Sequence, residues 1–143
     1  MNMKKKTEIW TMVGAGALII ALFAVAAFAQ GASFRFFGPL SRIITPNGDL
    51  TKNNGTAIFC FDNPSQSGVS GNIFTLLGSA VASMGPVTQN PAGSACPAGV
   101  FANSGEYVTW DGRSNGVTVR SGIYVYRITA EEKNYTGTLI VVR

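Results

Sequence analysis

After residue 30 the sequence is a series of short apolar tracts separated by glycine, proline and asparagine, and this pattern limits the chain to an all-β fold. No tract keeps the three- and four-residue apolar spacing of an amphipathic helix. Side chains alternate instead: in residues 56–62, Phe59 and Phe61 fall on one face, and Ile58 and Cys60 on the other. We predict an immunoglobulin-like antiparallel β-sandwich of about seven strands, formed by tracts at 34–45, 56–62, 72–78, 80–84, 106–110, 122–130 and 135–143.

The tract 122–130 has apolar side chains on both faces, with Ile123 and Val125 on one and Tyr124 and Tyr126 on the other. A strand that is covered on both sides lies in the middle of its sheet. We therefore predict a central strand here. It is joined to the last tract by a short polar connection that is typical of a hairpin.

The first 29 residues have the composition of a signal peptide. Three lysines precede an apolar run of about twenty residues that ends in Ala27-Phe28-Ala29, and we predict cleavage before Gln30. The run is also long enough to span a bilayer, so an uncleaved N-terminal anchor is the alternative. Either interpretation exports the rest of the chain to the cell surface or the medium, with membrane contact only through an uncleaved segment.

The exported part divides into an N-terminal extension or strand at 30–42 and a β-sandwich domain at 43–143. Its only two cysteines are Cys60 and Cys96, and an even number in an exported chain favours a disulfide. Two buried thiols are the alternative. Residues 85–105 lack strand periodicity, so we predict a long surface loop that is held through Cys96.

The tract 107–128, YVTWDGRSNGVTVRSGIYVYRI, combines turn residues with aromatic ones and could be a reactive loop or a structural corner. Gly112 and Gly116 can take positive φ, and Asp111 is suited to an Asx turn at the end of the strand that finishes with Trp110. The tract is therefore interpreted as a corner.

The segment TWDGRSNGVTVRSGIYVYRITA resembles the recurrent signature of the Ig-like domain of flagellar hook-capping proteins, a module also found at the C-terminal ends of bacterial secreted and cell-surface proteins. Upstream, ITPNGDLTKNNG is similar to the opening of these modules and of gliding-motility C-terminal domains. The resemblance spans 43–143 and implies an Ig-like fold. It assigns structural roles to Trp110, Asp111, Gly112, Gly116, Val119, Gly122, Tyr124, Tyr126 and Ile128.

The composition argues against several kinds of chemistry. The chain has no histidine, which excludes Ser-His and Cys-His catalysis and histidine metal sites. Glu106 and Asp111 could form a carboxylate pair, but no third group is placed to orient them. Asn47, Asp49 and Asn53 could offer oxygens to calcium, although an Asx-rich turn is the preferred interpretation. We predict no catalytic, cofactor or metal site, and the dispersed arginines predict no nucleic-acid partner.

Two functions remain, both of which depend on protein partners. The first is a non-enzymatic subunit of a bacterial surface layer, appendage or extracellular filament, with self-association through contacts between β-sandwiches. Phe34, Phe36 and Phe37 are expected to be exposed and to form an assembly segment that adds a strand to a neighbour. The second is a monomeric binding or adhesion module that docks an envelope, secretion or appendage partner through residues 85–105 or a sheet edge.

Overall fold

The computed structural model of the chain describes residues 33–46, 55–90, 95–97 and 105–143. They belong to one compact unit, Ala32–Arg143. Every regular element in these ranges is a β-strand, which confirms the all-β prediction, and none of these residues belongs to a helix that could cross a bilayer. The predicted signal peptide at 1–29 lies outside the described residues.

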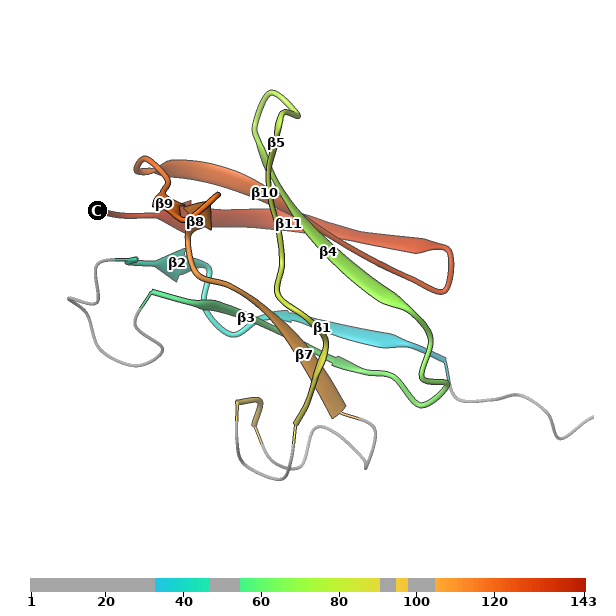
Figure 1. Cartoon of the computed structure of the whole chain (residues 1–143). Helices are drawn as coiled ribbons and strands as arrows, with labels where there is room; N and C mark the ends of the chain where they lie inside the picture. Colours follow the sequence, from blue (N-terminus) through green and yellow to red (C-terminus); the bar gives the residue numbers. More distant parts are fainter. Residues whose placement is uncertain (1–32, 47–54, 91–94, 98–104) are drawn as a thin grey trace, which may run out of the picture. The chain divides into compact units, whose positions relative to one another are not determined.

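The strands form two larger sheets and one small one (Figure 1). The four-stranded sheet has the order β1-β3-β7-β6 and the five-stranded sheet the order β2-β11-β10-β4-β5, while β8 pairs with β9. The bounds are β1 (Arg35–Pro39), β2 (Ile43–Ile44), β3 (Ala57–Asp62), β4 (Val69–Thr75), β5 (Ala80–Ser83), β6 (Thr88–Gln89), β7 (Gly105–Trp110), β8 (Arg113–Ser114), β9 (Val117–Thr118), β10 (Gly122–Ala130) and β11 (Lys133–Val141).

The two larger sheets share one hydrophobic core. The ring of Phe59 in β3 lies 5.0 Å from that of Tyr126 in β10, which joins the sheets across the core. The inward residues of β3 are the alternate ones that the sequence predicts. Full burial of a large apolar side chain contributes about 1.5–3 kcal/mol to stability. The largest fully buried side chains are Phe59, Phe61, Ile73, Ile128, Leu139, Val108 and Val141, together with Cys60 outside this core.

Strands β10 and β11 form the longest hairpin, and β10 is the middle strand of its sheet, as predicted. The turn is Glu131-Glu132, and both residues have positive φ, as a type I′ hairpin turn requires. The prediction that β10 is covered on both faces is wrong. Ile123 is 48% exposed and Arg127 is exposed as well, because an antiparallel sheet can bury one face and leave the other in solvent.

The tract predicted at 34–45 divides into two strands that belong to different sheets. β1 pairs antiparallel with β3, whereas β2 pairs parallel with β11. Gly38 has a φ of +89°, a conformation that favours glycine, at an irregularity in the β1–β3 register, and β1 ends one residue later at Pro39 before the chain crosses over.

Residues 85–105 also contain a short strand that the sequence did not predict. β6 is only two residues long and pairs with β7 through Thr88 and Gln89. A two-residue strand is too short for an alternating pattern to reveal it.

Candidate functional site

The corner after β7 is held by hydrogen bonds from its own residues. Trp110 is buried, and its indole N–H donates to the Arg113 carbonyl at 2.9 Å. The Arg113 backbone N–H donates to Oδ1 of Asp111 at 3.1 Å, which confirms the predicted Asx turn. Gly112 has a φ of +73°, and a Cβ at this position would collide with the ring of Pro46. The glycine is therefore required by both its backbone and its surroundings.

A two-residue turn then produces the β8–β9 hairpin. Asn115 and Gly116 have φ values of 50° and 80°, the positive pair typical of Asn-Gly in a type I′ turn. Positive φ at Gly116 was predicted from the sequence and is confirmed, whereas the hairpin was not predicted, although the Asn-Gly pair is its signal. Gly122, by contrast, is not needed to avoid a close contact, because a Cβ there would meet only the Tyr124 ring at 4.0 Å.

Two tyrosines fix the start of β10. The Tyr124 hydroxyl donates to the Arg120 carbonyl at 2.8 Å, and its ring lies 5.6 Å from that of Trp110. Tyr126 lies opposite Gly137 in β11, where a Cβ would collide with the tyrosine hydroxyl. Burial raises the pKa of Tyr126, and the positive charge of Arg42 partly opposes this shift. The aromatic residues of the tract are thus part of the packing.

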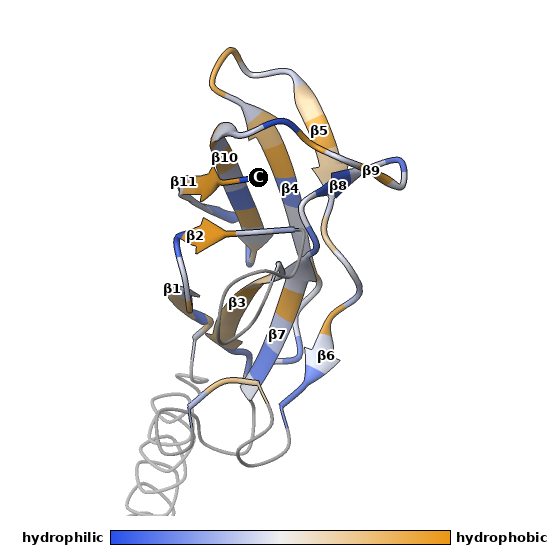
Figure 2. Ribbon diagram, turned by 90° about the vertical axis from the view of Figure 1, so that its left-hand side faces the viewer, coloured by the Kyte–Doolittle hydropathy of each residue, from blue (hydrophilic) through white to orange (hydrophobic). Residues whose placement is uncertain are grey.

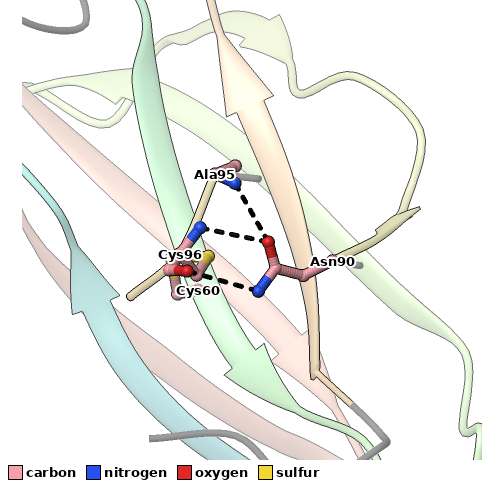
Figure 3. Close-up of a disulfide and its surroundings, with 4 residues drawn as sticks. All are labelled: Cys60, Asn90, Ala95 and Cys96. Atoms are coloured by element: carbon pink, nitrogen blue, oxygen red, sulfur yellow. Dashed lines mark hydrogen bonds between the residues drawn. A yellow bond between two sulfur atoms is a disulfide. The ribbon is translucent and has the colours of Figure 1, made fainter. Parts of the chain in front are cut away.

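Cys60 and Cys96 form the predicted disulfide (Figure 3). Cys60 lies on the outer face of the four-stranded sheet, and residues 95–97 cover it there so that it is only 1% exposed. The Asn90 side chain holds this cover in place. Its Oδ1 accepts from the backbone N–H groups of Ala95 and Cys96 at 3.0 and 3.1 Å, and its Nδ2 donates to the Cys96 carbonyl at 3.4 Å. The position of Cys96 in a loop was predicted from the sequence, but the role of Asn90 was not.

The phenylalanine segment at the N-terminal end does not have the exposure expected for it. Phe34 is 4% exposed and packs 5.1 Å from Phe61, and Phe36 packs 5.5 Å from Tyr135. Only Phe37 faces solvent, at 37% exposed, with the Arg35 guanidinium over its ring. The expectation of an exposed segment is therefore wrong for Phe34 and Phe36, because β1 completes the chain's own sheet and core.

The candidate chemical groups are not brought together. Glu106 is buried at the start of β7, where the side-chain amides of Asn63 and Gln89 donate to its carboxylate. Asp111 lies beyond the other end of the same strand, about 16 Å away at 3.3 Å per residue. Glu106 and Asp111 therefore do not form a carboxylate pair. The possible calcium ligands Asn47, Asp49 and Asn53 lie outside the described residues.

The outer face of the five-stranded sheet carries an apolar surface that the sequence analysis did not recognise as exposed. Ile43, Ile140 and Ile123 lie opposite one another on β2, β11 and β10, and they are 56%, 41% and 48% exposed. We call these three residues the isoleucine row. Figure 2 shows the hydrophobic ends of β2 and β11 side by side. The sequence offered one signal for this surface: both strands of the β10–β11 hairpin carry apolar residues at the positions that alternate with the core residues.

Neighbouring residues extend this surface. Val125 lies opposite Phe74 of β4 in the next outward position, and the Arg127 guanidinium lies 4.9 Å from the centre of the Phe74 ring. Leu76 and Leu77, directly after β4, are also exposed. A connected apolar surface of this kind on a folded domain is typical of a protein interaction site.

Searches against models of known protein families and against curated proteins found no match to this chain. Its function therefore has to be inferred from its own residues.

Proposed function

We propose that this protein is a non-enzymatic, exported structural protein, a subunit of a bacterial surface layer, appendage or extracellular filament. The observation that carries this proposal is the exposed isoleucine row on the five-stranded sheet. Exposed apolar side chains that lie in register across three strands form an apolar surface, and covering such a surface with another protein is favourable because it removes apolar area from water. The proposed occupants are other copies of the same chain.

The fold proposed for this subunit is an immunoglobulin-like β-sandwich related to the Ig-like domain of hook-capping proteins. Three observations support it: two sheets share a core, β2 and β11 pair in parallel after the chain crosses between sheets, and Tyr124 bonds to the backbone four residues upstream. The last feature is typical of the tyrosine corner in immunoglobulin-like domains. A resemblance in fold does not define the role of a protein, so the functional proposal is based on the isoleucine row.

Export is proposed together with this role. The disulfide between Cys60 and Cys96 is consistent with folding in an oxidising compartment, where such bonds persist. The N-terminal segment supplies the expected export signal. An intact-mass measurement of the exported product checks both points, because cleavage before Gln30 and formation of the disulfide each change the mass by a defined amount.

The function is tested by replacing Ile123 with lysine. Burying a lysine charge within this apolar surface is costly when no opposite charge faces it. Ile123→Lys should therefore abolish ordered polymers as seen by negative-stain electron microscopy. Ser70→Lys is the matched control, because Ser70 is exposed on the outward side of β4, far from the row. The control should assemble like the wild type.

Two results would contradict the proposal. If wild-type protein stays dispersed and monomeric at high concentration, the structural role is wrong and a monomeric binding or adhesion module becomes the better description. If Ile123→Lys and Ser70→Lys both assemble normally, the protein still self-associates, but not through the isoleucine row.

A further inference from the structure

In the part of the chain that the structure describes, strand β11 has an edge that is unpaired over most of its length. It is nine residues long, but β2, its neighbour on the side away from β10, pairs only with Ile140 and Val141. Asn134, Thr136 and Thr138 are exposed, and no strand among the described residues pairs with them on that side.

The direction of the backbone groups follows from the bonds that β2 makes. The N–H groups of Ile140 and Val142 donate away from β10, to the carbonyls of Arg42 and Ile44 at 2.7 and 3.0 Å. The β10–β11 register has no bulge between its first pair, Gly122 with Val141, and its last pair, Ala130 with Lys133. Since direction alternates along an antiparallel strand, the even-numbered residues at 134, 136 and 138 also point their N–H and C=O groups outward.

The other edges of the two larger sheets are protected. β1 contains Pro39 and an irregular register, β6 has only two residues, and β2 is equally short. β5 has a register shift against β4, and its Val81 carbonyl accepts a hydrogen bond from the Ser114 hydroxyl at 2.6 Å. Proline, bulges and short length are the usual protections of a sheet edge. The edge at 134–138 has none of them and no charged residue.

We propose that this edge of β11 pairs antiparallel with the same edge of a second copy. With Thr136 opposite Thr136 of the partner subunit, the three outward residues of each chain meet in three pairs and can form about six backbone hydrogen bonds. Neutral threonine and asparagine side chains face each other, so identical edges approach without charge repulsion. The contact is self-complementary, as a two-fold symmetric dimer requires.

This inference rests on the proposed function in one respect, because it names the first contact between subunits of the assembly. The isoleucine row lies outside the edge segment 134–138, and its side chains project from the face of the sheet, so they take no part in the edge pairing. Edge pairing and face packing can thus be tested separately.

The test uses the full chain, expressed with its own N-terminal segment, and the Thr136→Pro and Thr136→Val variants. Proline removes an N–H that points outward and makes no bond to β10, whereas valine keeps the N–H and the β-branched shape. Sedimentation should give a dimer for the wild type and for Thr136→Val. The dissociation constant of Thr136→Pro should be larger by about tenfold or more.

Amide hydrogen exchange followed by NMR gives a second measurement that does not depend on a variant. The amides of Asn134, Thr136 and Thr138 should exchange slowly in concentrated wild-type protein and rapidly after dilution. Amides that stay fast at every concentration, or a Thr136→Pro variant that folds and dimerises as tightly as the wild type, would overturn the inference. If the protein forms polymers but the amides of Asn134, Thr136 and Thr138 exchange rapidly, the edge pairing is wrong and the proposed function stands. If these amides are protected in a dimer that never polymerises, the edge pairing stands and the proposed function is wrong.

Discussion

The outer faces of the two larger sheets are treated differently by the same chain. On the four-stranded sheet, residues 95–97 cover Cys60 and are fastened by the disulfide. On the five-stranded sheet, Ile123 and Ile140 remain about half exposed. Both faces carry apolar side chains at alternate positions, so composition alone does not distinguish them. The apolar side chain at Cys60 is therefore covered by the chain itself, whereas Ile123 and Ile140 stay exposed among the described residues, and it is this exposure on which the proposed contact between subunits depends.

The largest effect is expected from removing the cover of the first face. Replacing Cys60 and Cys96 together with alanine opens a loop with a sequence separation of 36 residues. The chain-entropy model gives a loss of about 4 kcal/mol in the free energy of unfolding. Denaturant unfolding of the oxidised wild type and the double variant measures it. A loss below about 1 kcal/mol would mean that residues 95–97 stay in place without the bond.

The next largest effect on the free energy of unfolding is expected on the buried side of β11, and the exposed side of the same strand provides the comparison. Leu139 is fully buried in the core, whereas the adjacent Ile140 belongs to the isoleucine row. Leu139→Ala should lower the free energy of unfolding by about 3 kcal/mol, because it leaves a cavity. Ile140→Ala should cost less than about 1 kcal/mol in a monomer. Urea unfolding at low protein concentration checks this, and equal losses would show that Ile140 is covered in the monomer.

A smaller effect is expected at Gly137, where β11 passes under Tyr126. A Cβ on Gly137 would collide with the tyrosine ring, so Gly137→Ala should destabilise the fold by about 2 kcal/mol through overpacking. Ser70→Ala, at an exposed outward position of β4 outside both the isoleucine row and the β11 edge, is the control and should change stability by less than about 0.5 kcal/mol. Thermal unfolding of both variants provides the comparison. A neutral Gly137→Ala would indicate that Tyr126 can move aside.

The smallest effect is a pH dependence that comes from Tyr126. Because burial raises the pKa of this tyrosine in the folded state, its contribution to stability is fully present below a pH of about 10. The contribution is lost as the pH rises from there through the raised pKa. The stability of wild-type protein should therefore fall more steeply with alkaline pH than that of Tyr126→Phe. Parallel curves in denaturant titrations would contradict this.

Much of the fold could be predicted from the sequence because the signals were local. Alternating apolar residues located β3, β7 and the β10–β11 hairpin, and the Asp-Gly and Asn-Gly pairs located the corner after Trp110. β6 and the separation of β1 from β2 were missed because neither has a local pattern: β6 is two residues long, and the separation depends on which strand each one meets. The exposure of Ile123 was missed for a related reason, since an apolar residue on a strand has the same periodicity whether its face is covered or not. The β8–β9 hairpin was missed although its Asn-Gly pair was a local signal.

The all-β class and the turn chemistry at Asp111 and Gly112 could be predicted from the sequence, because they depend on backbone preferences and on local patterns. The sequence also favoured a disulfide between its two cysteines, although two buried thiols were the alternative. The tertiary structure places Phe34 in the chain's own core and residues 95–97 against Cys60, and among the described residues it leaves the isoleucine row exposed and most of the β11 edge unpaired. Burial and edge pairing are relations between segments far apart in the chain. They are fixed only when the sheets have packed, because the free energy of each contact depends on the neighbour that supplies it.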